Sequence, residues 1–109
     1  MNLTLILYIL FTHWVADFVF QTNEMALNKS KSIEWLSYHV CVYTLPWFVI
    51  GWQFALINGI CHWVIDFLSS KVNAVLYEKS RHYFFVAIGF DQFLHYVVLF
   101  GSYFFLYIR

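Results

Sequence analysis

The sequence has 109 residues, of which 62% are hydrophobic, 24% aromatic and only 11% charged, and its mean hydropathy is +0.68. This composition excludes an ordinary soluble domain and predicts a membrane protein. Six Lys and Arg are balanced by six Asp and Glu, so no excess of positive charge indicates a nucleic-acid partner, and we expect none.

Four long apolar segments follow one another along the chain, which predicts an all-α fold. A helix needs about 20 residues to cross a hydrocarbon core of about 30 Å, and the segments approach or exceed that length. Pro46 lies within the second segment, where we expect it to bend the helix without ending it. We therefore predict a single integral membrane domain over residues 1–109, a bundle of four transmembrane helices. Their approximate bounds are 3–22, 33–51, 54–77 and 83–108.

The distribution of basic residues predicts the orientation of this bundle. The opposite side of the predicted membrane carries only Arg109 and the amino terminus. The positive-inside rule therefore places both polar connectors in the cytoplasm and both termini outside, in a multi-pass protein of the bacterial inner membrane. The basic residues of the connectors after the first and third helices are Lys29, Lys31, Lys71, Lys79 and Arg81.

The pattern His-Trp-Val-x-Asp-Phe occurs twice, beginning at His13 and again at His62. In each copy the histidine and the aspartate, Asp17 or Asp66, are four residues apart, so a helix presents both on one face. A parallel internal repeat of this kind predicts two similar helical hairpins in the same orientation.

The other ionisable groups of the apolar segments fall at the same predicted depth. At 1.5 Å per residue, His39 lies about two turns into the second helix, and Asp91 and His95 lie two to three turns into the fourth. We therefore expect one layer of seven ionisable groups in the cytoplasmic half of the bilayer. They are His13, Asp17, His39, His62, Asp66, Asp91 and His95.

Four histidines and three aspartates on four helices form a ligand set typical of one or two first-row metal ions in a bundle core. Imidazole together with carboxylate suits divalent Zn, Mn, Fe or Co, and a cation makes buried, ionised carboxylates favourable. We predict all seven groups as metal ligands, with His39 as a ligand or a general base. Gln21 lies one turn beyond Asp17, where it either contacts a substrate or a metal-bound water, or simply ends the helix at the interface.

Four short motifs carry a resemblance to a known family. They are H-x3-D-F-x2-Q-T-x2-M-A-x2-K from His13 to Lys29, W-L-x2-H from Trp35 to His39, H-x3-D from His62 to Asp66, and D-Q-x2-H from Asp91 to His95. This combination resembles a family of small bacterial and phage membrane proteins catalogued as a domain of unknown function. More loosely, the H-x3-D spacing in apolar helices is similar to that of bacterial inner-membrane proteins described as metal-dependent hydrolases.

Three functions are compatible with these features. The first is metal-dependent hydrolysis of a lipid or amphipathic substrate, which suits a site at this depth and which the looser resemblance favours. The second is a carrier or channel for metal ions or protons, built from the same groups. The third is a non-catalytic interaction protein in which the polar layer only fixes helix packing. We expect membrane lipids as partners and a homo-oligomer, because four helices make a thin wall around a polar centre.

Overall fold

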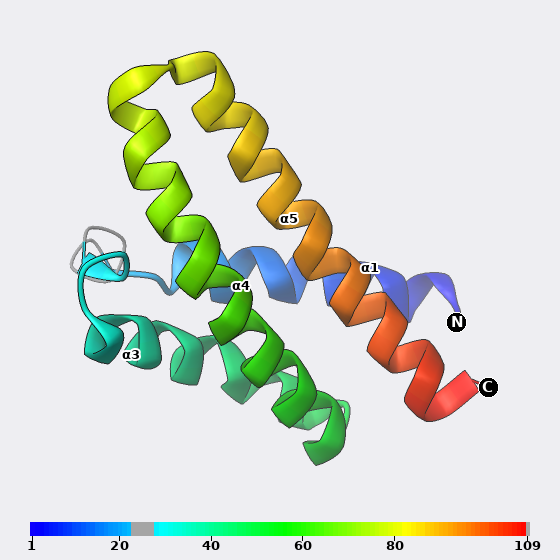
Figure 1. Ribbon diagram of the computed structural model, residues 1–109. Helices are drawn as coiled ribbons and strands as arrows, with labels where there is room; N and C mark the ends of the chain where they lie inside the picture. Colours follow the sequence, from blue (N-terminus) through cyan, green and yellow to red (C-terminus); the bar gives the residue numbers. More distant parts are fainter. Residues whose placement is uncertain (23–27, 109) are drawn as a thin grey trace.

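The computed structural model describes residues 1–22 and 28–108, and within these ranges the protein is all-α, with four helices and no strand (Figure 1). The predicted all-α class and the number of helices are confirmed. Three of the four helices end in a short segment of different pitch. The elements are α1 (Leu3–Trp14) with the π-helical η1 (Val15–Val19), α3 (Ile33–Thr44) with the 3₁₀-helical η2 (Leu45–Val49), α4 (Trp52–Lys79), and α5 (Arg81–Tyr103) with the π-helical η3 (Phe104–Ile108).

Local chemistry explains several of these boundaries. The side chain of Asn2 accepts a hydrogen bond of 2.9 Å from the backbone N–H of Leu5, which caps α1. Ser80 is the single extended residue between α4 and α5, and its hydroxyl accepts from the N–H of Tyr83 at 3.4 Å. Pro46 lies in η2, where the α-helix gives way to a 3₁₀-helix, so the second helical segment continues past the proline to Val49.

The helices form an up-and-down arrangement in which α4 and α5 make a closely packed antiparallel hairpin (Figure 1). The helix α3 packs along α4, and it meets the first helical segment mainly through η1. Both termini lie at one end of the bundle. At the other end, the Nζ of Lys71 donates to the backbone carbonyl of Ser30 at 3.1 Å, so Lys71 lies beside the connector that carries Lys29 and Lys31.

The surface and the interior have an unusual distribution of polarity. Buried side chains of the described residues are polar or ionisable about as often as they are apolar, while large apolar side chains of every helix are exposed. One helix of the described chain, Arg81–Ile108, is long and apolar enough to cross a membrane, and the apolar Leu3–Val19 is shorter. One such helix is weak support for membrane insertion, so the four predicted spans stay a prediction.

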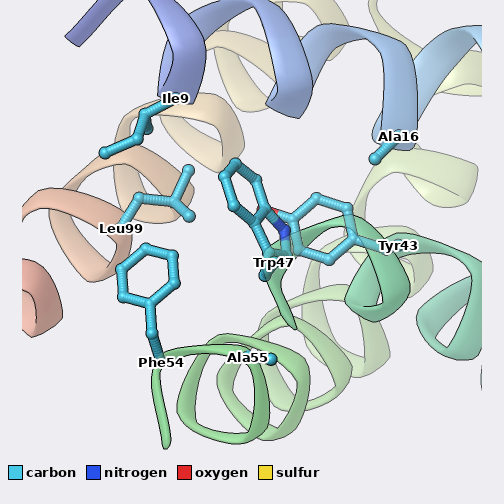
Figure 2. Close-up of a cluster of buried hydrophobic side chains, with 7 residues drawn as sticks. All are labelled: Ile9, Ala16, Tyr43, Trp47, Phe54, Ala55 and Leu99. Atoms are coloured by element: carbon cyan, nitrogen blue, oxygen red, sulfur yellow. The ribbon is translucent and has the colours of Figure 1, made fainter. Parts of the chain in front are cut away.

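An apolar cluster joins all four helices at the end of the bundle that holds the termini (Figure 2). The ring of Trp47 packs between Tyr43 and Phe54, with ring centroids 5.9 and 5.6 Å away. Ile9 from α1 and Leu99 from α5 are fully buried against these rings. All cluster residues except Ala16, which lies between His13 and Asp17, are nearer the termini than the predicted ionisable layer. The cluster therefore closes this end of the bundle and fixes how the helices cross.

The close approach of α3 and α4 depends on Gly59. A Cβ atom at this position would lie 2.5 Å from Oγ1 and 3.1 Å from Cγ2 of Thr44, whose hydroxyl is held by a 2.7 Å bond to the carbonyl of Val40. We expect Gly59→Ala to destabilise the protein by about 1–3 kcal/mol through overpacking, although alanine is the better helix former. Thermal unfolding followed by circular dichroism measures this loss.

Gly89→Ala is the matched control, because Gly89 is an exposed position in α5 where an added Cβ meets nothing within 4 Å. Because alanine has a higher helix propensity than glycine, this substitution should leave stability unchanged or raise it by up to about 1 kcal/mol. Equal effects of the two substitutions would contradict a close α3–α4 contact at Gly59.

Candidate metal centre

The seven ionisable groups predicted for the polar layer are all buried, and none is more than 8% exposed. Every helical segment contributes at least one of them, so helices distant in the sequence converge on one polar centre. His13 comes from α1, Asp17 from η1, His39 from α3, His62 and Asp66 from α4, and Asp91 and His95 from α5.

Four of these groups present one donor atom each to a common point. The Nε2 of His39 lies 3.1 Å from the Nε2 of His62, 3.0 Å from Oδ1 of Asp17 and 3.2 Å from Oδ2 of Asp66. The Nε2 of His62 lies 3.4 Å from the same oxygen of Asp17 and 3.2 Å from the same oxygen of Asp66. The four atoms form a compact set, which we call the first donor group.

The separations in the first donor group match the edges of a metal coordination sphere. A tetrahedral ion with metal–ligand bonds of about 2.0–2.1 Å holds its ligand atoms about 3.3–3.4 Å apart. Adjacent ligands of a six-coordinate ion with bonds of the same length are about 3.0 Å apart. The observed 3.0–3.4 Å therefore suits a first-row cation of either geometry and does not choose among Zn, Mn and Fe.

Hydrogen bonding alone satisfies the first donor group poorly. Each Nε2 atom carries at most one hydrogen, and ionised carboxylates only accept. If both imidazoles are protonated at Nε2, the two N–H groups of His39 and His62 face each other at 3.1 Å. If one is not, it can accept the N–H of the other ring, but its lone pair still lies 3.0–3.4 Å from two carboxylate oxygens. A cation among the four atoms would satisfy all of these lone pairs at once.

A second donor group lies beside the first and shares Asp66 with it. The Nε2 of His95 lies 3.3 Å from Oδ1 of Asp66 and 3.4 Å from Oδ1 of Asp91. The imidazole rings of His62 and His95 stack at 4.2 Å between centroids, and Tyr43 stacks on the other side of His62 at 3.8 Å. Packing of these rings therefore orients the histidines of both groups.

His13 lies outside both donor groups. Its Nε2 is 2.7 Å from Oε1 of Gln92, an oxygen that only accepts, so this nitrogen carries the hydrogen and Nδ1 accepts the hydroxyl of Tyr43 at 3.0 Å. His13 and Asp17 share one face at the start of the π-helix η1, with the Nε2 of His13 3.7 Å from Oδ2 of Asp17. Asp17 uses its other oxygen, Oδ1, in the first donor group, while Gln92 and Tyr43 engage both ring nitrogens of His13.

A polar pocket of about 590 Å³ opens next to the donor groups, and Asp17 and Asp91 line it. The Nζ of Lys29 reaches Oδ2 of Asp66 at 3.3 Å. Three further residues on the pocket wall, Gln21, Ser70 and Asn73, each have a buried oxygen without a hydrogen-bond partner among the described residues. The predicted substrate contact Gln21 thus lies on the pocket wall, and the pocket offers both charge and free polar atoms to a polar molecule.

The model of one protein family, described as "Protein of unknown function (DUF3307)", matches residues 5–108. The chain belongs to the DUF3307 family. This finding confirms the resemblance to a family of unknown function, and the match includes all seven ionisable groups. No curated protein and no solved structure matches, so no named relative supports the looser similarity to metal-dependent hydrolases.

The motifs that suggested the DUF3307 family now have structural positions. The structure brings together the histidines and aspartates of the W-L-x2-H, H-x3-D and D-Q-x2-H motifs, at His39, at His62 and Asp66, and at Asp91 and His95. From the first motif it adds Asp17 as a donor, and Lys29 of the same motif contacts Asp66. Met25 and Ala26 of that first motif, like Arg109 of the predicted outer side, lie outside the described residues.

Two polar residues near the donor groups were missed as site residues by the sequence reasoning. The amide nitrogen of Gln92 donates to Oδ2 of Asp91 at 3.1 Å and to Oδ2 of Asp17 at 3.4 Å, and the hydroxyl of Ser69 donates to Oδ1 of Asp91 at 2.7 Å. A glutamine next to an aspartate inside an apolar segment is a signal that the sequence does contain. Ser69 follows the segment's end and carries no such signal.

Proposed function

We propose that this protein is an integral membrane protein whose buried His/Asp centre binds a divalent transition metal ion and hydrolyses a lipid or an amphipathic substrate. The observation that carries the proposal is the first donor group, in which four buried atoms from three helical segments lie together. Its two histidine nitrogens are 3.0–3.4 Å from each other and from both carboxylate oxygens. Such a set of intramembrane ionisable groups is costly without a function or a bound cation.

The distribution of side chains supports membrane embedding. Large apolar residues cover the outside of all four helices, among them Leu7, Val49, Ile60 and Phe93, and each is at least half exposed. Exposed apolar surface on this scale indicates contact with lipid or with other proteins. The closeness of Lys71 to Ser30 supports a common side for both basic connectors, which we propose to be cytoplasmic in a multi-pass inner-membrane protein with both termini outside.

The chemistry follows from what a divalent ion supplies in such a centre. The ion would make a coordinated water acidic enough to act as hydroxide near neutral pH, and it would polarise the substrate's carbonyl or phosphoryl oxygen. In such a hydrolysis the water oxygen would bond to the carbonyl carbon or phosphorus, the bond to the leaving group would break, and the leaving group would take up the water's proton. Gln21, on the pocket wall, would contact the substrate or the water. His39 would act as a ligand, because its Nε2 is enclosed by the other donor atoms.

Two neighbouring pockets favour a substrate with a polar head and an apolar chain. The polar pocket borders the donor groups, and an apolar groove of about 370 Å³ runs between α4 and α5 past Leu68, Phe90 and Leu94. Asn73 and Asp91 line both. A molecule at this junction would place its head beside the metal ligands and its hydrocarbon chain in the groove, open to surrounding lipid.

The transport alternative has less support. An open channel needs a polar path through the whole bundle, whereas the apolar cluster around Trp47, Phe54 and Leu99 fills it between the donor groups and the terminal end. A purely structural polar layer explains the hydrogen bonds of His13 but not the facing nitrogens of His39 and His62. As partners we propose membrane lipids and further copies of this chain.

Metal analysis tests the first step of the proposal. We expect the protein, purified through a tag without histidine, to retain at least about one transition metal ion per chain, because four ligand atoms are already gathered. His62→Ala should lose this ion. His82→Ala is the matched control, because His82 is exposed at the start of α5, and it should retain the ion. Less than about one ion per chain, unchanged by His62→Ala, would exclude the centre.

Hydrolysis is tested with vesicles of bacterial membrane lipid that contain the purified protein. Mass spectrometry should detect released head groups or fatty acids, and their release should stop with a chelator or with His62→Ala and persist with His82→Ala. A metal-loaded protein that releases no product from these vesicles would contradict lipid hydrolysis and would favour the transport alternative. Uptake of metal or protons by the same vesicles, lost in Asp66→Asn, would then establish transport.

A further inference from the structure

We propose that the centre holds two divalent cations bridged by the carboxylate of Asp66, and that the second cation faces the polar pocket. This inference rests on the metal centre of the proposed function. Its basis is that the two oxygens of Asp66 serve different donor groups. Oδ2 lies 3.2 Å from Nε2 of both His39 and His62, whereas Oδ1 lies 3.3 Å from Nε2 of His95.

The spacing of the two donor groups suits a pair of ions. A carboxylate that binds one ion through each oxygen holds the ions about 3.5–4 Å apart, the separation typical of two-metal hydrolytic sites. The stacked rings of His62 and His95, with centroids 4.2 Å apart, present their Nε2 atoms side by side to opposite oxygens of Asp66. Two cations can therefore be bound without either histidine leaving its packed position.

The two positions differ in the number of protein ligands. The first has four, which fill a tetrahedral sphere or leave two positions of a six-coordinate one, while the second has three, from Asp66, Asp91 and His95. A metal with three protein ligands keeps coordination positions for water and substrate, as catalytic ions do. Asp91 lines the polar pocket, so those positions open toward it. The second cation is thus the one that would meet the substrate.

The wall of the pocket supports a ligand at this position. Ser70 is only 7% exposed, and its hydroxyl has no hydrogen-bond partner among the described residues. Gln21, which follows the end of η1, also has a buried oxygen without a partner in that part of the chain. A buried polar atom left unpaired is destabilising, so these groups are expected to bind water or substrate bound to the second ion.

Charge balance indicates the chemical class of that substrate. The three aspartates of the donor groups carry three negative charges, and two divalent cations exceed them by one positive charge. Lys29, which contacts Asp66 from the pocket side, adds another. An anionic head group such as a phosphate ester would neutralise this excess, whereas a neutral one would not. We therefore infer that the substrate's head group is anionic.

Manganese binding tests the number of ions directly. After the bound metal is removed with a chelator and Mn²⁺ is added back, we expect about two ions per chain. Electron paramagnetic resonance should show the exchange-coupled signal of two bridged Mn²⁺ ions. His95→Ala should bind about one ion and give an uncoupled signal, while His82→Ala should behave like the wild type. Inorganic phosphate should perturb the coupled spectrum of the wild type at millimolar concentrations.

The possible results separate this inference from the proposed function. One ion per chain with an uncoupled signal in the wild type, unchanged in His95→Ala, would overturn the second cation and leave a mononuclear hydrolase intact. Two coupled ions without lipid hydrolysis would support the second cation and contradict the proposed reaction. A coupled spectrum that phosphate leaves unchanged would overturn the assignment of an anionic head group. Because the wild-type spectrum decides the number of ions, poor folding of a variant does not affect that result.

Discussion

Replacing Asp66 with Asn is expected to abolish the binding of both metal ions, whereas Asp91→Asn is expected to remove only the second. Asp66 is the only residue shared by the two donor groups of the described chain, and it is 2% exposed. Asparagine keeps the size of the side chain but removes the negative charge and turns one ligand oxygen into a hydrogen-bond donor. Loss of a residue that positions a ligand costs 10–100-fold in metal affinity, and we expect loss of this shared ligand to cost more than about 100-fold at each site.

Isothermal titration of the metal-free variants with Zn²⁺ measures these affinities. Glu34→Gln provides the control, since it makes the same carboxylate-to-amide change at an exposed position in the first turn of α3. It should bind metal as the wild type does. If Asp66→Asn instead retained one ion at wild-type affinity, Asp66 would not be shared between two sites. Retention of both ions would show that Asp66 is not a metal ligand.

The fold was predictable because the sequence alternates between apolar runs and polar connectors. The four helices and their approximate limits follow from that alternation, and Ser80 marks the turn between α4 and α5. The positions at which the helices cross could not be predicted from this alternation. The approach of α3 to α4 depends on the absence of a side chain at Gly59, and the change of pitch at Val15–Val19 depends on packing that periodicity does not express.

The composition of the site was predictable, but the role of each residue was not. Spacing along one helix correctly placed His62 and Asp66 on the same face, because α4 is a regular α-helix throughout. The same spacing placed His13 and Asp17 on one face, with Nε2 and Oδ2 3.7 Å apart, but the hydrogen bonds of His13 to Gln92 and Tyr43 keep its ring out of the donor groups. Which oxygen of Asp66 faces which histidine depends on how three helices cross, and no pattern within a single helix contains that information.

Trp47→Ala is expected to cause the largest loss of stability in the molecule, about 3–5 kcal/mol, the range found for removing a buried aromatic side chain. Trp47 is fully buried between Tyr43 and Phe54, and its ring contact with Phe54 packs η2 against α4. Trp52→Ala is the matched control, because Trp52 is 62% exposed, and its replacement should change stability by less than about 1 kcal/mol. Chemical or thermal unfolding of the metal-free proteins measures both.

The same variant shows whether the apolar cluster and the metal centre stabilise the bundle independently. His39 and Trp47 belong to one continuous helical segment, so a bound ion holds α3 against α4 at one end while Trp47 holds it at the other. Metal that binds only the folded protein raises stability by mass action. If the two ends act independently, saturating Zn²⁺ should raise the stability of Trp47→Ala and of the wild type by equal amounts, within about 0.5 kcal/mol. A much smaller increase in the variant would mean that the ligands are gathered only when the cluster is intact, and the centre would then depend on the packing of the opposite end of the bundle.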